Sequence, residues 1–190
     1  YYYCHAMTLS ALQSGLRDLL LAHSVTRGDF VLASGRRSSV YVDARKTTMA
    51  GAGLTLIGAL GLERLDARGW SPRAVGGLTL GADPVAYAIA AAANARGRAL
   101  DAFTVRKAAK THGTERRIEG CFESGMPVVV IEDVITSGGS ARNAVAALRE
   151  AGAQVLGVLA LVDRQEGGRA AVESDGVPVD ACLTAADLGL

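Results

Sequence analysis

The chain has 190 residues, of which 49% are hydrophobic and only 5% aromatic, and its 20 basic and 19 acidic side chains leave a net charge of +1. This length suits a single domain with a sizeable core, and a core built from aliphatic rather than aromatic residues is typical of α/β proteins. The near-zero charge argues against a nucleic-acid-binding protein, and no apolar run reaches the ~18 residues that are needed to cross a membrane.

The cysteines and the first residues bear on the cellular compartment. Cys4, Cys121 and Cys182 are odd in number, far apart and without CxxC spacing. We interpret them as reduced thiols of a cytosolic protein, since this pattern fits neither a disulfide framework nor a zinc site. Residues 1–6 have neither the basic start nor the apolar centre of a signal peptide, and Met7 resembles a natural start. We therefore expect residues 1–6 to be a remnant of cloning that lies outside the fold.

The first half of the chain is expected to contain helices and short strands. Leucines at helical spacing predict a helix from Thr8 onward, with Ser10 as its cap. Two β-type runs, 30–32 and 40–42, surround a polar turn and predict a hairpin. The pattern then predicts a helix over 54–68, a strand over 74–78, a helix over 84–96 and a strand over 100–105.

The second half begins with a polar, basic stretch over 106–120 that lacks apolar periodicity, so we expect a loop there. A strand over 127–131, a helix over 140–151 ended by Gly152, and a strand over 155–162 follow. Strands that are apolar on both faces and alternate with helices imply an α/β fold, with a mainly parallel sheet and helices on both faces. The N-terminal helix and hairpin are expected to form a small lobe beside it.

The segment from Val128 to Ser140 joins a buried strand, two carboxylates and a turn rich in hydroxyls and glycine. Glu132 and Asp133 come at the carboxyl end of the strand, where open α/β sheets bind ligands. The turn leads into a helix, whose N-terminal amides can donate to a phosphate. The carboxylates would repel phosphate, but they suit sugar hydroxyls or a phosphate-bound Mg²⁺. A glycine-rich turn alone would indicate a simple connection, whereas adjacent acids before it favour a binding site.

This segment resembles the phosphoribosyl diphosphate signature of the type I phosphoribosyltransferases. The resemblance implies that Glu132 and Asp133 hold the ribose 2′ and 3′ hydroxyls. It implies that the 5′-phosphate is cradled by Thr136, Ser137, Gly138, Gly139 and Ser140. The implied fold is the type I core with a small N-terminal hood, in one domain over 7–190 with the hood at about 7–50 and the core at about 51–190. The implied cofactor is Mg²⁺, bound through phosphoribosyl diphosphate near the acid pair rather than by the protein directly.

The base is indicated first by the stretch from Arg106 to Gly113, whose dense basic charge would by itself indicate a solvated surface. Its pattern resembles the catalytic loop of the orotate phosphoribosyltransferases. The resemblance implies that Arg106, Lys107, Lys110 and His112 contact the diphosphate, whose leaving group gains negative charge in the transition state. It also implies a homodimer in which this loop serves the neighbouring subunit. We expect Lys107, Lys110, His112 and Asp133 to be catalytic, with His112 assisting proton transfer.

Two further segments resemble the orotate-binding parts of that family. The stretch from Ser34 to Arg45 is similar to the family's hood, which implies that Tyr41 flanks the base. The stretch from Asp163 to Arg169 is similar to the orotate-binding end of a strand. This implies that Arg164 binds the carboxylate of orotate, for which its planar fork is suited, with Thr136 as a second contact to the base.

The chain departs from the family pattern at two positions. Ala33 and Gly81 occur where family members carry lysines that touch the diphosphate. We therefore expect the basic loop, together with Arg45, to supply a larger share of the positive charge.

The implied activity is transfer of the 5-phosphoribosyl group from phosphoribosyl diphosphate to orotate, a step of pyrimidine biosynthesis in the cytoplasm. No Ser or Cys nucleophile paired with a His is apparent, which agrees with a largely dissociative transfer without a covalent intermediate. One alternative is transfer to another base such as a purine, which would leave Arg164 and the His112 loop unexplained. The other is a non-catalytic regulator that senses phosphoribosyl diphosphate and binds nucleic acid, which the net charge disfavours. We expect no nucleic acid and no membrane among the partners.

Overall fold

A six-stranded sheet forms the centre of the computed structural model, which describes residues 8–31, 37–107 and 117–190. The strand order is β5-β4-β3-β6-β7-β8. The strands are β3 (Ala74–Leu78), β4 (Asp101–Val105), β5 (Ile118–Gly120), β6 (Pro127–Ile135), β7 (Gln154–Asp163) and β8 (Val179–Thr184). All neighbouring strands are parallel except β4 and β5. The prediction of a mainly parallel sheet is therefore confirmed.

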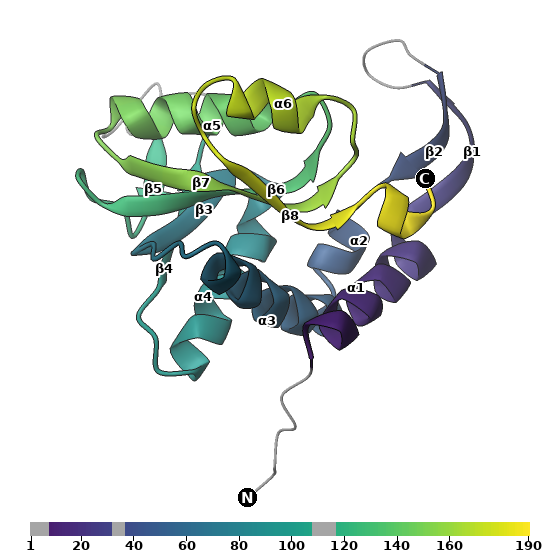
Figure 1. Ribbon diagram of the computed structural model, residues 1–190, viewed down its shortest axis with the longest axis horizontal. Helices are drawn as coiled ribbons and strands as arrows, with labels where there is room; N and C mark the ends of the chain where they lie inside the picture. The colour runs from purple at the N-terminus through teal and green to yellow at the C-terminus, as the bar shows by residue number, and fades with distance from the viewer. Residues whose placement is uncertain (1–7, 32–36, 108–116) are drawn as a thin grey trace, which may run out of the picture.

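Helices cover both faces of this sheet (Figure 1). On one face lie α1 (Leu9–His23), α3 (Gly51–Ala67) and α4 (Ala82–Ala95), and on the other lie α5 (Gly139–Glu150) and α6 (Gly168–Glu173). Residues of β6 alternate between the two cores: Val129 and Ile131 pack into one, and Val128 and Val130 into the other. This explains why β6 is apolar at every position from Val128 to Ile131, because a parallel sheet is buried on both sides.

The N-terminal part adds a hairpin and a short helix. The strands β1 (Val25–Val31) and β2 (Arg37–Val42) form a separate antiparallel sheet, so the predicted hairpin is confirmed with longer strands. The short helix α2 (Arg45–Thr48) leads from the hairpin into α3, and the 3₁₀ helix η1 (Ala186–Leu188) lies near the end of the chain. Helix α1 packs three leucines into the same core as α3: Leu12, Leu16 and Leu20. None of the helices in the described ranges is long and apolar enough to cross a membrane.

The structure corrects three predicted boundaries. The cap of α1 is Thr8 rather than Ser10, since the Thr8 hydroxyl accepts a hydrogen bond from the Ala11 N–H at 3.2 Å, and Ser10 lies inside the helix. The stretch over 106–120 is not all loop, because its last three residues form β5 and pair with β4. The strand predicted over 127–131 continues to Ile135, because hydrogen bonding to β7 keeps its polar residues within the sheet.

Candidate active site

Two adjacent carboxylates lie in the second half of β6, toward the edge where the parallel strands end. Burial raises the pKa of Glu132 to about 8, and the charge of Asp133 and a hydrogen bond between the two side chains add to this shift. Burial also raises the pKa of Asp133. Two interactions act in the opposite direction and lower this pKa: the Val134 N–H, which donates to Oδ1 of Asp133 at 2.9 Å, and the positive charge of Arg45. Desolvated carboxyl groups of this kind gain free energy from a ligand that brings hydroxyl donors or a cation.

The turn after β6 presents the N-terminus of α5. Gly138 precedes the helix in a left-handed conformation, with φ of 80°, and a Cβ there would lie 2.7 Å from the carbonyl oxygen of Gly168. Only glycine fits both conditions. The helix has no side-chain cap, and the hydroxyl residues Thr136, Ser137 and Ser140 around it are exposed. Uncapped amides beside exposed hydroxyls suit an anion such as phosphate.

Arg164 follows β7 and is tied to the same turn, because its backbone N–H donates to the carbonyl oxygen of Ile135 at 3.0 Å. Its side chain is only 14% exposed, and its Nη2 lies 3.0 Å from Oε1 of Glu166. Within the described residues its buried Nε has no hydrogen-bond partner. A buried N–H without an acceptor is costly. A planar anion such as a carboxylate would supply the missing acceptor.

The loop that carries Arg164 is anchored by the buried carboxylate of Asp163. Its Oδ1 accepts a hydrogen bond from the Gln165 N–H at 2.8 Å, and its Oδ2 lies 3.0 Å from Nε of Arg169. Gln165 adopts a φ of 56°, which is uncommon for a residue with a side chain. These contacts hold the backbone on both sides of Arg164 and so limit the positions that its side chain can take.

The turn between β3 and α4 lies against the acid pair. A Cβ added at Gly81 would fall 2.5 Å from Oδ2 of Asp133 and 2.6 Å from its Oδ1. The Thr79–Leu80 peptide bond in this turn is cis. The lysine expected from the family pattern is thus replaced by a glycine that lets the turn approach the carboxylate of Asp133.

The hairpin and the short helix α2 that follows it contribute an aromatic ring and a cation. Arg45 pairs with Asp43 through Nε and Oδ1 at 2.8 Å, and its charge reaches Asp133, as the effect on the pKa of that carboxyl shows. Tyr41 is exposed, and its ring packs against Phe30 with the ring centroids 5.7 Å apart. The expected orotate contact Tyr41 is therefore available on the surface, and Arg45 lies close enough to the acid pair to act on it.

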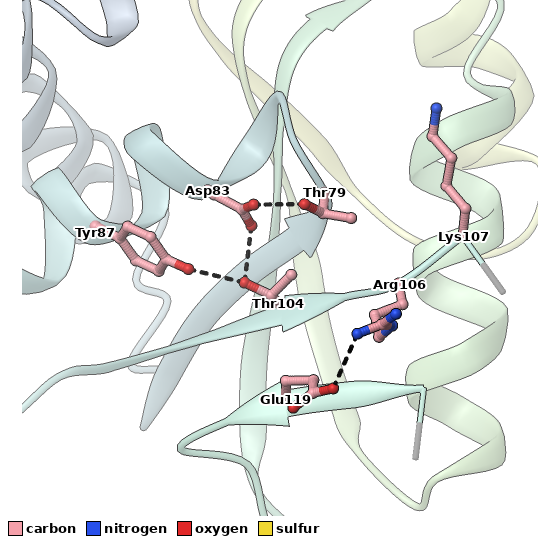
Figure 2. Close-up of a pocket in the computed structure, with 7 residues that line it drawn as sticks. All are labelled: Thr79, Asp83, Tyr87, Thr104, Arg106, Lys107 and Glu119. Carbon is pink, nitrogen blue, oxygen red and sulfur yellow. Dashed lines mark hydrogen bonds and ion pairs between the residues drawn. The ribbon is translucent and has the colours of Figure 1, made fainter. Parts of the chain in front are cut away.

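The basic segment begins at the edge of the sheet (Figure 2). Arg106 pairs with Glu119 of β5 at 3.3 Å, and its N–H donates to the carbonyl oxygen of Arg117 at 2.8 Å. Lys107 is exposed and extends away from this pair. The predicted site residues Lys110 and His112 lie outside the described residues, as does Ala33. The described structure therefore places only the first two of the four predicted basic contacts.

A polar cavity of about 620 Å³ adjoins the start of the basic segment. It is lined by Thr79, Asp83, Tyr87, Thr104, Arg106, Lys107 and Glu119 (Figure 2). Asp83, which the sequence motifs do not indicate, is buried at the start of α4 and accepts hydrogen bonds from two threonines. The signal that could have found it is an acid two residues after Gly81 and directly before Pro84, in the first turn of a helix.

The comparisons with known proteins agree with this geometry. A family model described as the phosphoribosyl transferase domain matches residues 50–178. The orotate phosphoribosyltransferase of Mycobacterium avium (strain 104) is 48% identical over 175 residues, which are 92% of this chain and 95% of that protein.

Solved structures show the same similarity. The crystal structure of the Mycobacterium tuberculosis H37Rv orotate phosphoribosyltransferase in complex with Fe(III) dicitrate superposes with a TM-score of 0.84 at 45% identity, covering 94% of this chain and 99% of that one. The structure from the same organism in complex with 5-phospho-α-D-ribosyl 1-diphosphate has a TM-score of 0.80 at 42% identity, with the same coverage.

Proposed function

The chain belongs to the orotate phosphoribosyltransferase family, and from this premise we propose the reaction that it catalyses. It transfers the 5-phosphoribosyl group of phosphoribosyl diphosphate to orotate and releases orotidine 5′-monophosphate and pyrophosphate, a step of pyrimidine biosynthesis. One observation carries this assignment above the others. The acid pair, the α5 turn and Arg164 with its unpaired Nε belong to β6 and β7 and the turns that follow them, and they match the sugar, the phosphate and the orotate carboxylate.

The carboxylates of Glu132 and Asp133 accept hydrogen bonds from the ribose 2′ and 3′ hydroxyls in this proposal, and the α5 turn holds the 5′-phosphate. In the transfer, the bond from the ribose C1′ to the diphosphate breaks and the ring gains positive charge. Carboxylates held close to the sugar stabilise that charge more in the transition state than in the ground state. No covalent bond between the enzyme and the sugar is required.

Arg164 binds the orotate carboxylate, while Tyr41 and Thr136 contact the base. An arginine fork suits a planar carboxylate, and the buried position of this guanidinium strengthens the interaction. The leaving diphosphate is stabilised by Arg106, Lys107, Lys110 and His112. Arg45, at the start of α2, adds a further cation, which supports the expectation that it takes part in place of the absent lysines.

Mg²⁺ fits this site as a companion of the substrate. The acid pair offers oxygen ligands of the kind that Mg²⁺ prefers, and the described residues contain no group of three or more His, Cys, Asp or Glu that could hold a metal alone. We propose that Mg²⁺ arrives on phosphoribosyl diphosphate and lies near Glu132 and Asp133 without being bound by the protein directly. When bound, the ion offsets the negative charge of the diphosphate.

We propose that the enzyme works as a homodimer in the cytoplasm, with the hood over the base and the core holding phosphoribosyl diphosphate. The dimer rests on the resemblance of the stretch from Arg106 to Gly113 to a loop that serves the neighbouring subunit in this family. Cys121 and Cys182 are both free, which fits a reducing compartment.

A substrate panel tests the proposed reaction. The protein is incubated with phosphoribosyl diphosphate, Mg²⁺ and one base at a time while pyrophosphate release is followed. Orotate should be turned over, whereas uracil, which is orotate without the carboxylate, and the purines adenine and hypoxanthine should react far more slowly. Faster turnover of adenine or hypoxanthine would instead indicate a phosphoribosyltransferase that acts on purines. Phosphoribosyl diphosphate binding without turnover of any base would instead indicate a sensor of this metabolite.

A further inference from the structure

Asp83 of α4 joins two segments of the proposed diphosphate site. Its side chain is buried, with 8% of the residue exposed. Its Oδ2 accepts a hydrogen bond from the Thr79 hydroxyl at 2.7 Å, and its Oδ1 accepts one from the Thr104 hydroxyl at 2.8 Å (Figure 2). Each carboxylate oxygen therefore accepts a hydrogen bond from a different threonine. Thr79 directly follows β3, and Thr104 lies near the end of β4.

The two threonines lie where the diphosphate contacts begin. Thr79 opens the turn whose Gly81 lies against Asp133, and Thr104 is two residues before Arg106. The strands themselves are already aligned, since Gly77 pairs with Thr104 and the Thr79 N–H donates to the carbonyl oxygen of Val105 at 2.9 Å. Asp83 adds a side-chain link between Thr79, which follows β3, and Thr104 of β4, in addition to these backbone hydrogen bonds.

The hydrogen-bond directions follow from the donors that are present. A carboxylate oxygen only accepts, so both threonine hydroxyls must donate to Asp83. The Thr104 proton is then committed, and the Tyr87 hydroxyl, 3.0 Å away, must be the donor to Thr104 Oγ1. The carboxylate also lies in the first turn of α4, where the helix dipole favours a negative charge. Each hydroxyl and each carboxylate oxygen of this network thus has a hydrogen-bond partner.

We propose that Asp83 is a positioning residue for the diphosphate, an inference that rests on the proposed function. By holding Thr79 and Thr104 together, it sets the distance between the turn at Thr79–Gly81 and the start of the basic segment at Arg106. These are the two protein segments that flank the leaving group. The carboxylate touches neither substrate, and it acts through the two hydroxyls that it orients.

Four single variants and one double variant, Thr79→Val/Thr104→Val, test this role. Asp83→Ala removes both hydrogen bonds, Thr79→Val and Thr104→Val remove one each, and Asp83→Asn keeps two polar partners because its amide can accept from one hydroxyl and donate to the other. Asp101→Asn, an exposed acid at the other end of β4, is the matched control. For each variant we would measure KM for phosphoribosyl diphosphate and orotate, KM for pyrophosphate in the reverse reaction, kcat, and the melting temperature.

Asp83→Ala should raise KM for phosphoribosyl diphosphate and for pyrophosphate on the order of tenfold to a hundredfold and lower kcat, because small displacements of binding groups have effects of this size. KM for orotate should stay near the wild-type value. Asp83→Asn should recover part of the loss. The double variant Thr79→Val/Thr104→Val should match Asp83→Ala, and its effect should differ from the sum of the single effects because the two hydroxyls share one partner.

A merely structural role predicts another pattern: a lower melting temperature and a smaller active fraction, with all KM values unchanged. That result, in Asp83→Ala or in the threonine variants if Asp83→Ala fails to fold, would overturn the proposal. The failure of the proposed function is distinct. If the wild-type protein does not use orotate, the binding of phosphoribosyl diphosphate can still be measured by calorimetry. The proposed role of Asp83 then requires that the threonine variants bind phosphoribosyl diphosphate more weakly than Asp101→Asn does.

Discussion

Arg164 is the residue on which the choice of base depends most directly. Arg164→Ala removes the planar donor and should raise KM for orotate far more than KM for phosphoribosyl diphosphate. Truncating one partner of a buried charged pair costs about 2–5 kcal/mol, so the change in kcat/KM for orotate should exceed tenfold. Steady-state kinetics with each substrate varied in turn measures the two effects separately.

Arg164→Lys is the matched control for this prediction. It keeps the positive charge but loses the fork, so its effect on KM for orotate should lie between those of the wild type and Arg164→Ala. Equal increases in both KM values would mean that Arg164 supports the loop through Glu166 rather than binding the base.

Glu132 makes the stability of the free protein depend on pH. Its pKa is raised from 4.5 to about 8 by burial and by Asp133, so between these values the folded state binds more protons than the unfolded state. The free energy of unfolding should therefore fall as the pH rises through this window, by at most ~1.4 kcal/mol per pH unit from this group. Urea unfolding of the wild type and of Glu132→Gln at pH values from 5 to 9 measures it.

Glu132→Gln should remove most of this fall, since the amide does not titrate. Glu150→Gln, at an exposed position of α5, is the control and should follow the wild type. If Glu132→Gln and the wild type lose stability in parallel as the pH rises, other groups determine the pH dependence. Solvent would then have to reach the carboxyl group of Glu132 in the folded protein.

At the scale of elements, the turn between β3 and α4 is shaped by the contact between Gly81 and Asp133. Gly81→Lys restores the lysine of the family pattern, but its Cβ would fall 2.5 Å from Oδ2 of Asp133, whose other oxygen is held by the Val134 N–H. Forcing atoms into a packed site costs about 1–3 kcal/mol. We therefore expect Gly81→Lys and Gly81→Ala both to weaken phosphoribosyl diphosphate binding, as measured by calorimetry.

Gly51→Ala provides a control for the loss of a glycine, since a Cβ there meets nothing within 4 Å. It should bind phosphoribosyl diphosphate as the wild type does. Tighter binding of phosphoribosyl diphosphate by Gly81→Lys would contradict this prediction. It would show that the turn can accommodate a lysine side chain and that the wild-type protein lacks only its positive charge.

The elements that could be predicted from the sequence are those with a strong local pattern. The β-branched run of β6 and the helix that follows its glycine turn were predicted because hydrophobic burial and the turn determine both. The strand β5 was not predicted, since Ile118 is its one apolar residue and its pairing with β4 is a tertiary contact. The continuation of β6 through Glu132 was missed for the same reason, because β7 supplies the hydrogen bonds that keep two acids in a strand.

At the scale of the whole molecule, the site could be predicted only as separate motifs. The acid pair, the phosphate turn and Arg164 each have a chemical pattern in the sequence, and the order of the strands then brings them to one edge. The contact of Gly81 with Asp133 and the link from Asp83 to Thr104 join positions that are far apart in the chain. Such contacts depend on how the finished sheet is packed, and local sequence patterns carry no information about them.

The largest assembly that the proposal requires is a dimer with shared sites. The basic segment leaves β4, and the acid pair lies on β6, two strands away and thus about 10 Å across the sheet. The chain between Lys107 and Arg117 is long enough to reach its own acid pair, whereas the family resemblance implies that it serves the acid pair of a neighbour. Distance alone therefore does not decide between the two arrangements, and activity in mixed dimers can.

Mixing two inactive variants, Lys110→Ala and Asp133→Asn, separates the arrangements. If each site takes its basic segment from the partner subunit, a mixed dimer has one site with both residues intact and one that lacks both. Random exchange of equal amounts makes half of the dimers mixed, so about a quarter of the wild-type activity should return. Each variant incubated alone is the control, and subunit exchange is followed with a tag on one variant. Complete exchange without recovered activity would mean that the segment serves the subunit to which it belongs.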